Sequence, residues 1–149
     1  MTLTEKIKEN EGLKDHSYED SLGRPTVGYG FLLAALTADE LALNGGKYEP
    51  MSKETADKIL ELKLKKLTAA VFATFDWLKE KPKNVQEVVI EMAYQLGVSK
   101  VKKFVTTMHH IRAGEYRAAY QSGMSSLWAK QTPNRAKKVL SGLFNFAGE

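Results

Sequence analysis

The chain of 149 residues contains no cysteine, four prolines and three histidines. The absence of cysteine excludes disulfides, thiol catalysis and zinc–thiolate sites. The histidines offer little for an imidazole metal site, because the adjacent pair His109 and His110 would point about 100° apart on a helix. We therefore expect no metal and no other cofactor.

The N-terminal residues lack a hydrophobic run. Residues 1–8 are charged and poor in apolar side chains, which is typical of neither a secretory signal nor a transmembrane anchor. We therefore expect a soluble protein that is cytoplasmic when made. The length is that of one domain that can bury a hydrophobic core without disulfides, so we predict a single domain over residues 1–149.

Charge is divided unevenly along the chain, which has a net charge of +4. From residue 100 onward there are nine lysines and arginines against two acids, a net charge of +7, whereas the first 99 residues carry −3. A basic surface of this kind fits nucleic acid, anionic lipid or a bacterial wall polymer equally well, so the charge alone does not select a partner.

Strand signals are confined to residues 17–31, where Tyr, Thr and Val are separated by Ser, Gly and Pro. Capping-box patterns at residues 2–5 and 37–40 predict two short helices, the first ending at Glu11-Gly12 and the second at residues 44–46. These patterns in the N-terminal third of the chain therefore predict a small lobe with a short antiparallel sheet.

The rest of the chain has the apolar spacing of helices. A long connecting helix is predicted over residues 52–79, and the uniformly apolar run at residues 85–96 predicts a central core helix. Shorter helices are expected around 104–111, 115–121 and 125–130, and a last one begins at Pro133 with Thr132 as its N-cap.

The fold class is thus α+β and mostly α-helical. A small α/β lobe (residues 1–51) is joined by the connecting helix (52–79) to a helical lobe (80–149), and packing of the N-terminal helix on the helical lobe is left open. A cleft between the lobes is the expected binding site, because extended ligands commonly bind there.

Two carboxylates and a hydroxyl bracket the glycine-rich segment near the N-terminus. Asp20 follows Glu11 by nine residues, Thr26 follows Asp20 by six, and Gly28-Tyr29-Gly30 comes next. A carboxylic acid, a carboxylate and a hydroxyl in one cleft are what glycoside hydrolysis requires. Taken singly, the acids would be solvated surface groups and the threonine an ordinary strand residue.

These residues carry a family resemblance. The segments Glu11-Gly12, Tyr18 to Asp20, Thr26 to Gly30, Tyr94 to Gly97 and Gln131 to Ala136 together resemble a phage-type lysozyme of glycoside hydrolase family 24, close to the lysozymes of the T-even bacteriophages. The resemblance spans essentially the whole chain.

The resemblance implies an inverting muramidase that cleaves the β-1,4 bond between N-acetylmuramic acid and N-acetylglucosamine in peptidoglycan. Glu11 would donate a proton to the leaving oxygen. Asp20 and Thr26 would hold the attacking water or stabilise the developing positive charge. Because Arg135 matches the family motif Thr-Pro-Asn-Arg, we expect it to reach across the cleft to Glu11.

The resemblance also implies residues that contact the substrate. Tyr94 would stack on a sugar face, and Leu32, Thr107 and Ser122 fall at further contact positions. Gln95 is expected to line the cleft as a hydrogen-bond donor. Family members commonly carry a histidine at the position of Phe31, paired with an acid on the long helix, where this chain has Leu62-Lys63. We expect apolar packing there to leave catalysis intact.

In such a role the protein would be a monomeric endolysin with peptidoglycan, not nucleic acid, as its partner. It would wait in the host cytoplasm until a holin-type membrane protein, with no direct contact, opens the way to the periplasm and wall. Two alternatives stay open: a noncatalytic basic domain that binds wall or nucleic acid, which predicts salt-sensitive binding without turnover, and a structural module of the virion.

Overall fold

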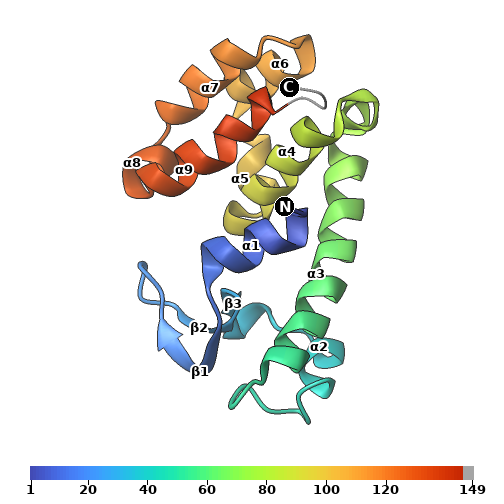
Figure 1. Cartoon of the computed structure of the whole chain (residues 1–149), viewed down its shortest axis with the longest axis vertical. Coiled ribbons are helices and arrows are strands. Elements are labelled where there is room, and N and C mark those ends of the chain that lie inside the picture. Colours follow the sequence, from blue (N-terminus) through green and yellow to red (C-terminus); the bar gives the residue numbers. More distant parts are fainter. Residues whose placement is uncertain (146–149) are drawn as a thin grey trace. The chain divides into compact units, whose positions relative to one another are not determined.

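The computed structural model describes residues 1–145 and divides into two compact units, one formed by residues 1–65 and the other beginning at Lys66. The division falls within the long helix α3 (Lys53–Thr74), drawn in green in Figure 1. A mostly helical chain with a small antiparallel sheet near its N-terminus is what the sequence predicted, and the structure confirms this fold class.

The first unit holds all the strands described over residues 1–145. Helix α1 (Leu3–Glu11) precedes a three-stranded antiparallel sheet of order β1 (Lys14–Glu19), β2 (Pro25–Gly28) and β3 (Phe31–Leu32). The 3-10 helix η1 (Leu33–Ala35), helix α2 (Ala38–Ala42) and the first part of α3 complete the unit.

Local capping interactions begin both short helices, as the sequence predicted. The Thr2 hydroxyl accepts a hydrogen bond from the Glu5 N–H at 3.1 Å at the start of α1. At α2 the box is reciprocal: the Glu40 N–H donates to Thr37 Oγ1 (3.2 Å) while the Thr37 N–H donates to Glu40 Oε1 (2.9 Å). Each contact satisfies an N–H that the helix itself leaves without a partner.

The register of the sheet places three side chains in a row. Tyr18 on β1 lies opposite Thr26 on β2, and Thr26 lies opposite Leu32 on β3. Directly opposed residues of antiparallel strands project to the same face. Strand β1 begins at Lys14, three residues before the predicted segment, because it is defined by pairing with β2 while its side chains are mostly exposed.

The position where the family commonly has histidine is buried, as expected, but its surroundings are not purely apolar. Phe31 is 2% exposed, and the Lys63 ammonium lies 5.6 Å from the centroid of its ring. Lys63 also forms an ion pair of 3.0 Å with Glu40, which is 1% exposed. Lys63 thus makes two contacts beside this position, a cation–π contact with Phe31 and a buried ion pair with Glu40.

The second unit is built around helix α4 (Lys83–Leu96). As predicted, α4 forms the core, with Val85, Val88, Val89, Met92 and Ala93 all buried. It packs against α5 (Val98–Lys102), α9 (Pro133–Leu140) and the 3-10 helix η3 (Ser141–Phe144). The predicted short helices are present as α6 (Val105–Ala113), α7 (Tyr116–Met124) and α8 (Leu127–Gln131).

Three details differ from the sequence prediction, the first being helix α5, which was not predicted. Helix α3 ends at Thr74, and the 3-10 helix η2 (Asp76–Glu80) follows, because Phe75 leaves the helical conformation with its ring buried. As predicted, α9 begins at Pro133 with Thr132 as the N-cap residue, but the Thr132 hydroxyl makes no capping bond and donates to the Trp128 carbonyl of α8 at 3.1 Å. None of the helices described over residues 1–145 is long and apolar enough to cross a membrane.

Candidate active site

Glu11 is the last residue of α1, and its carboxyl group lies against Gly30. A Cβ at Gly30 would overlap Glu11 Oε2 and would lie 2.7 Å from the carboxyl carbon. Gly30 also has φ +74°, a conformation that side chains other than glycine disfavour. The Gly-x-Gly pattern therefore has a physical reason: the turn must approach the Glu11 carboxyl group closely.

An ionic cluster centred on Asp57 fixes α1 to the same turn. Asp57 Oδ1 accepts a hydrogen bond from the Tyr29 hydroxyl (2.7 Å) and pairs with Lys8 (3.0 Å), while Oδ2 pairs with Lys53 (2.9 Å). Lys8 lies one helical turn before Glu11 on α1. The cluster thus joins α1, the Gly-Tyr-Gly turn and α3. Sequence reasoning missed it, since no local pattern links these positions.

The Asp57 cluster shifts two pKa values in opposite directions. The hydrogen bond from Lys53, aided by Tyr29 and Lys8, lowers the pKa of Asp57 to about 2. Burial, together with the hydrogen bond and the negative charge of Asp57, raises the pKa of Tyr29 to about 12. At neutral pH the Tyr29 hydroxyl is therefore a stable donor and Asp57 a stable anion.

Asp20 organises the turn between β1 and β2. Its Oδ1 accepts the Leu22 and Arg24 N–H groups, both at 2.9 Å, and its Oδ2 lies 2.9 Å from Nε and from Nη2 of Arg24. The Arg24 N–H, the Leu22 N–H and the Arg24 guanidinium hold the pKa of Asp20 below its usual value. Asp20 is therefore an anion at neutral pH, as a group that activates water must be.

Thr26 is 2% exposed, and its hydroxyl donates to the Arg24 carbonyl oxygen at 2.8 Å. Since its one donor is occupied, Thr26 Oγ1 can act only as an acceptor toward a further partner. Tyr18 lies opposite Thr26 in the sheet. Burial, together with the negative charges of Glu11 and Asp20, raises the pKa of Tyr18.

The first unit thus contains Glu11, Asp20 and Thr26, which come from three segments of the sequence. It also places Leu32 beside Thr26, where Leu32 lines a pocket of about 370 Å³ with Arg24 and Tyr48 among its walls. Tyr18 and Arg24 were not predicted as site residues. A signal for Arg24 existed, because Asp20 and Arg24 flank a tight turn with Gly23 between them.

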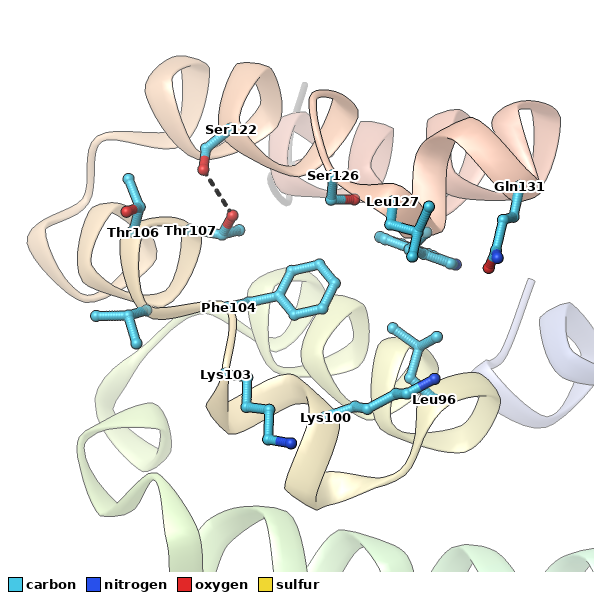
Figure 2. Close-up of a pocket in the computed structure, with 12 residues that line it drawn as sticks. Leu96, Lys100, Lys103, Phe104, Thr106, Thr107, Ser122, Ser126, Leu127 and Gln131 are labelled. Atoms are coloured by element: carbon cyan, nitrogen blue, oxygen red, sulfur yellow. Dashed lines mark hydrogen bonds between the residues drawn. The ribbon is translucent and has the colours of Figure 1, made fainter.

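In the second unit the predicted contact residues Thr107 and Ser122 meet directly. Thr107 Oγ1 on α6 and Ser122 Oγ on α7 are hydrogen-bonded at 2.8 Å. Both line a pocket of about 380 Å³, shown in Figure 2, which runs from the end of α4 past α5 and α6 to α7 and α8. The family resemblance placed these two residues at substrate-contact positions, where they match the family only in being small and polar.

The remaining predicted site residues lie on α4 and α9. Gln95 Oε1 accepts the indole N–H of Trp128 at 3.0 Å, and Gln95 Nε2 donates to Thr132 Oγ1 at 3.4 Å, so Gln95 ties α4 to α8 and the residue after it. Tyr94 and Arg135 are half-buried. The contact of Arg135 with Glu11 and the stacking role of Tyr94 stay predictions.

Comparison with known proteins identifies the family. The family model described as phage lysozyme matches residues 8–146. The chain belongs to the phage lysozyme family. This confirms the resemblance carried by the sequence motifs.

Three curated relatives are similar over nearly the whole chain. Identity is 27% to the pre-baseplate central spike protein Gp5 of Enterobacteria phage T4, across 93% of this chain. It is 24% and 25% to probable T4-type lysozymes 1 and 2 of Dictyostelium discoideum, across 94% of this chain. The chain spans 27% of the length of the spike protein and 92% of each Dictyostelium lysozyme.

Proposed function

We propose that this phage lysozyme family member is a muramidase that hydrolyses the β-1,4 bond between N-acetylmuramic acid and N-acetylglucosamine in peptidoglycan. The observation that carries the proposal is the seating of the Glu11 carboxyl group against Gly30, in the same unit as Asp20 and Thr26. The family match and the T4-type lysozyme relatives support the same reaction class.

Glu11 acts as the general acid in this proposal. Its carboxyl proton passes to the glycosidic oxygen as the bond from that oxygen to the muramic acid C1 breaks. A water molecule attacks C1 from the opposite face and gives its proton to Asp20, so the configuration at C1 is inverted. The products are a reducing N-acetylmuramic acid end and an N-acetylglucosamine with a restored hydroxyl group.

Asp20 and Thr26 position the water. Thr26 Oγ1 accepts a hydrogen bond from one O–H group of the water, because the Thr26 hydroxyl already donates to the Arg24 carbonyl. Asp20 Oδ2 accepts a hydrogen bond from the other O–H group of the water. The Arg24 guanidinium must then lose one of its two contacts with that oxygen. The N–H bonds to Oδ1 are unaffected and keep the carboxylate oriented.

The remaining predicted residues hold the glycan. We assign substrate contact to Leu32, Tyr94, Thr107 and Ser122, with Arg135 orienting Glu11 and Gln95 supporting the cleft. The direct support is the pairing of Leu32 with Thr26 and the position of Thr107 and Ser122 in one pocket.

The biological role that fits this activity is host-cell lysis by a monomeric endolysin. The enzyme would stay in the host cytoplasm until a holin-type membrane protein gives it access to the wall. One observation favours a second role: a relative carries the name central spike protein. The chain could then serve the virion with the same chemistry, and its presence in purified virions, measured by quantitative mass spectrometry, distinguishes the two roles.

The test of the activity is turnover of purified peptidoglycan by the wild type, by Glu11→Gln and by Glu9→Gln. Glu9 is an exposed acid on the same helix and serves as the matched control. We expect Glu11→Gln to lose at least about 1,000-fold in kcat, within the range that general acid catalysis contributes, while Glu9→Gln stays near the wild-type value. Salt-sensitive binding without turnover in all three proteins would instead indicate a noncatalytic wall-binding domain.

A further inference from the structure

Glu11 lies at the end of a short helix that has little buried surface of its own. Of the nine residues of α1, all within the described part of the chain, Ile7 alone is buried. The helix ends directly after Glu11, where Gly12 has φ +69° and its N–H donates to the Lys8 carbonyl at 2.9 Å. So short a helix is marginal by itself, because most helical stability in proteins comes from tertiary contacts. The position of the Glu11 carboxyl group therefore depends on what holds the last turn of α1.

Asp57 holds that last turn from α3. Its Oδ1 pairs with the Lys8 ammonium at 3.0 Å, and the two side chains are 31% and 29% exposed. Lys8 is three residues before Glu11, so the two side chains are neighbours on one side of α1. The Lys8 carbonyl is also the acceptor at which the helix ends. Lys8 thus links Asp57 to the turn of the helix that carries Glu11.

The same oxygen of Asp57 also holds the glycine-rich turn against which Glu11 lies. Oδ1 accepts the hydrogen bond of the Tyr29 hydroxyl at 2.7 Å, and Tyr29 is 3% exposed. The Lys8 ammonium lies 5.7 Å from the centroid of the Tyr29 ring. Gly30, the residue after Tyr29, is the one against which the Glu11 carboxyl group lies.

One oxygen atom is therefore tied to both sides of the contact between Glu11 and Gly30. Hydrogen bonds to a charged group are stronger than those between neutral groups, and a pKa of about 2 keeps Asp57 ionised at neutral pH. A catalytic group must be held within about 0.5 Å of its productive position. Loss of either contact of Asp57 Oδ1 therefore displaces Glu11 relative to the bond that it acts on.

We infer that Tyr29 and Asp57 are positioning residues for the proton transfer: they hold the Glu11 carboxyl group where it can protonate the leaving oxygen. Neither residue exchanges a proton with the substrate. This role rests on the proposed function for the part that Glu11 plays. It predicts an effect on kcat, with KM unchanged, that is present only when the leaving group needs a proton.

Two variants weaken one contact each. Tyr29→Phe removes the hydroxyl group and keeps the buried ring, whereas Asp57→Asn removes the charge and keeps an oxygen that can accept from Tyr29. The matched controls are Tyr120→Phe, at a half-buried tyrosine on α7, and Glu54→Gln, at an exposed acid in the first turn of α3. Thermal unfolding of each protein identifies an assay temperature at which all of them are folded.

Two substrates separate proton donation from binding. The first is purified peptidoglycan, whose leaving oxygen must be protonated. The second is a soluble peptidoglycan glycan that ends in N-acetylmuramic acid with 2,4-dinitrophenol attached at C1. Dinitrophenolate departs without a proton, so a general acid contributes little to its release. Glu11→Gln calibrates the comparison, because its loss of kcat should be large on peptidoglycan and much smaller on the aryl glycoside.

We expect Tyr29→Phe and Asp57→Asn each to lower kcat on peptidoglycan about three- to thirtyfold, less than the roughly 100-fold loss that a misplacement of about 1 Å can cause. KM should be unchanged. Both variants should match the wild type on the aryl glycoside, and the two controls should match it on both substrates. Equal losses on the two substrates would show a general structural role and would overturn the inference, as would a rise in KM alone or no loss at all.

The failure of the positioning role can be told apart from the failure of the proposed function. A large loss in Glu11→Gln beside unaffected Tyr29→Phe and Asp57→Asn would refute the positioning role alone. Wild-type turnover by Glu11→Gln, or no turnover by any of the proteins, would refute the proposed function. Carbon-13 NMR then still tests the positions: the carboxyl resonance of Glu11, identified as the signal absent from Glu11→Gln, should move in Tyr29→Phe and Asp57→Asn but not in Tyr120→Phe. An unmoved Glu11 resonance in the first two variants would overturn the inference.

Discussion

The guanidinium group of Arg24 holds the carboxylate of Asp20, with Nε and Nη2 both 2.9 Å from Oδ2. With the Arg24 and Leu22 N–H groups, which contribute more, this contact lowers the pKa of Asp20 and orients its carboxylate. It also occupies the oxygen that a water molecule would approach. Arg24 therefore influences both the pKa of Asp20 and the access of water to Asp20 Oδ2.

Replacing Arg24 with glutamine tests this relationship through the pH dependence of activity. Because an ionised Asp20 is required, kcat/KM falls as pH decreases through the pKa of Asp20. Removing the guanidinium raises that pKa toward its ordinary value, so the acid limb should move to higher pH. The shift is partial, because the Arg24 and Leu22 N–H groups still donate to Oδ1.

Arg117→Gln is the control for Arg24→Gln, since Arg117 is an exposed arginine in the second unit. Its pH–rate profile should superimpose on that of the wild type. An acid limb that moves equally in both variants would show that net charge, and not the contact with Asp20, sets the profile.

Gly30→Ala should abolish most activity. The added Cβ would overlap Glu11 Oε2 and displace the proposed acid, and the positive φ adds a backbone cost of about 1–2 kcal/mol. Gly45→Ala separates the two effects, because Gly45 also has positive φ but has nothing within 4 Å of the added Cβ. Thermal unfolding should show a similar loss of stability in both variants, and only Gly30→Ala should lose turnover. Full activity in Gly30→Ala would contradict the seating of Glu11.

The Asp57 cluster predicts how stability depends on pH. The pKa of Asp57 is lowered to about 2 in the folded chain, so the cluster stabilises the fold above the unfolded pKa, and that contribution is lost as pH falls through the folded value. Between pH 5 and about pH 2, the free energy of unfolding should fall less in Asp57→Asn than in the wild type. Urea titrations at several pH values measure this, and parallel curves would contradict it.

Lys63→Met tests the buried ion pair near Phe31. The substitution removes the cation beside Glu40, which is 1% exposed, and also the contact with the Phe31 ring. Loss of one partner of a buried pair costs about 3 kcal/mol or more, so the melting temperature should fall clearly at neutral pH. Lys58→Met, at an exposed position of the same helix, should melt within a degree or two of the wild type. Equal melting temperatures for the two variants would show that the pair adds no stability.

Local signals explain what the sequence could predict. Thr2, Thr37 and Glu40 act within four residues of their partners, so the starts of α1 and α2 follow from the pattern alone. The apolar period of α4 likewise predicted its burial. The position of Thr132 before α9 was predicted correctly, but its hydroxyl donates to the Trp128 carbonyl and accepts from Gln95 Nε2, partners that only the folded chain brings close.

Long-range contacts explain what the sequence could not predict. Tyr29 and Asp57 are 28 residues apart, and nothing near either position indicates that they are bonded. Lys63 of α3 lies over the Phe31 ring and pairs with Glu40, whose Oε1 also accepts the Thr37 N–H of the capping box. Spacing and the family resemblance selected Glu11, Asp20 and Thr26 as candidates, whereas the groups that surround them required the folded chain.

The most direct test of the central claim is the chemical nature of the ends that the enzyme makes. Peptidoglycan digested in water enriched in oxygen-18 should give fragments with one heavy oxygen on the reducing carbon of N-acetylmuramic acid, with none formed by Glu11→Gln. Mass spectrometry of the released muropeptides measures this. Unlabelled anhydro-muramic ends, or label on N-acetylglucosamine, would contradict hydrolysis of the proposed bond.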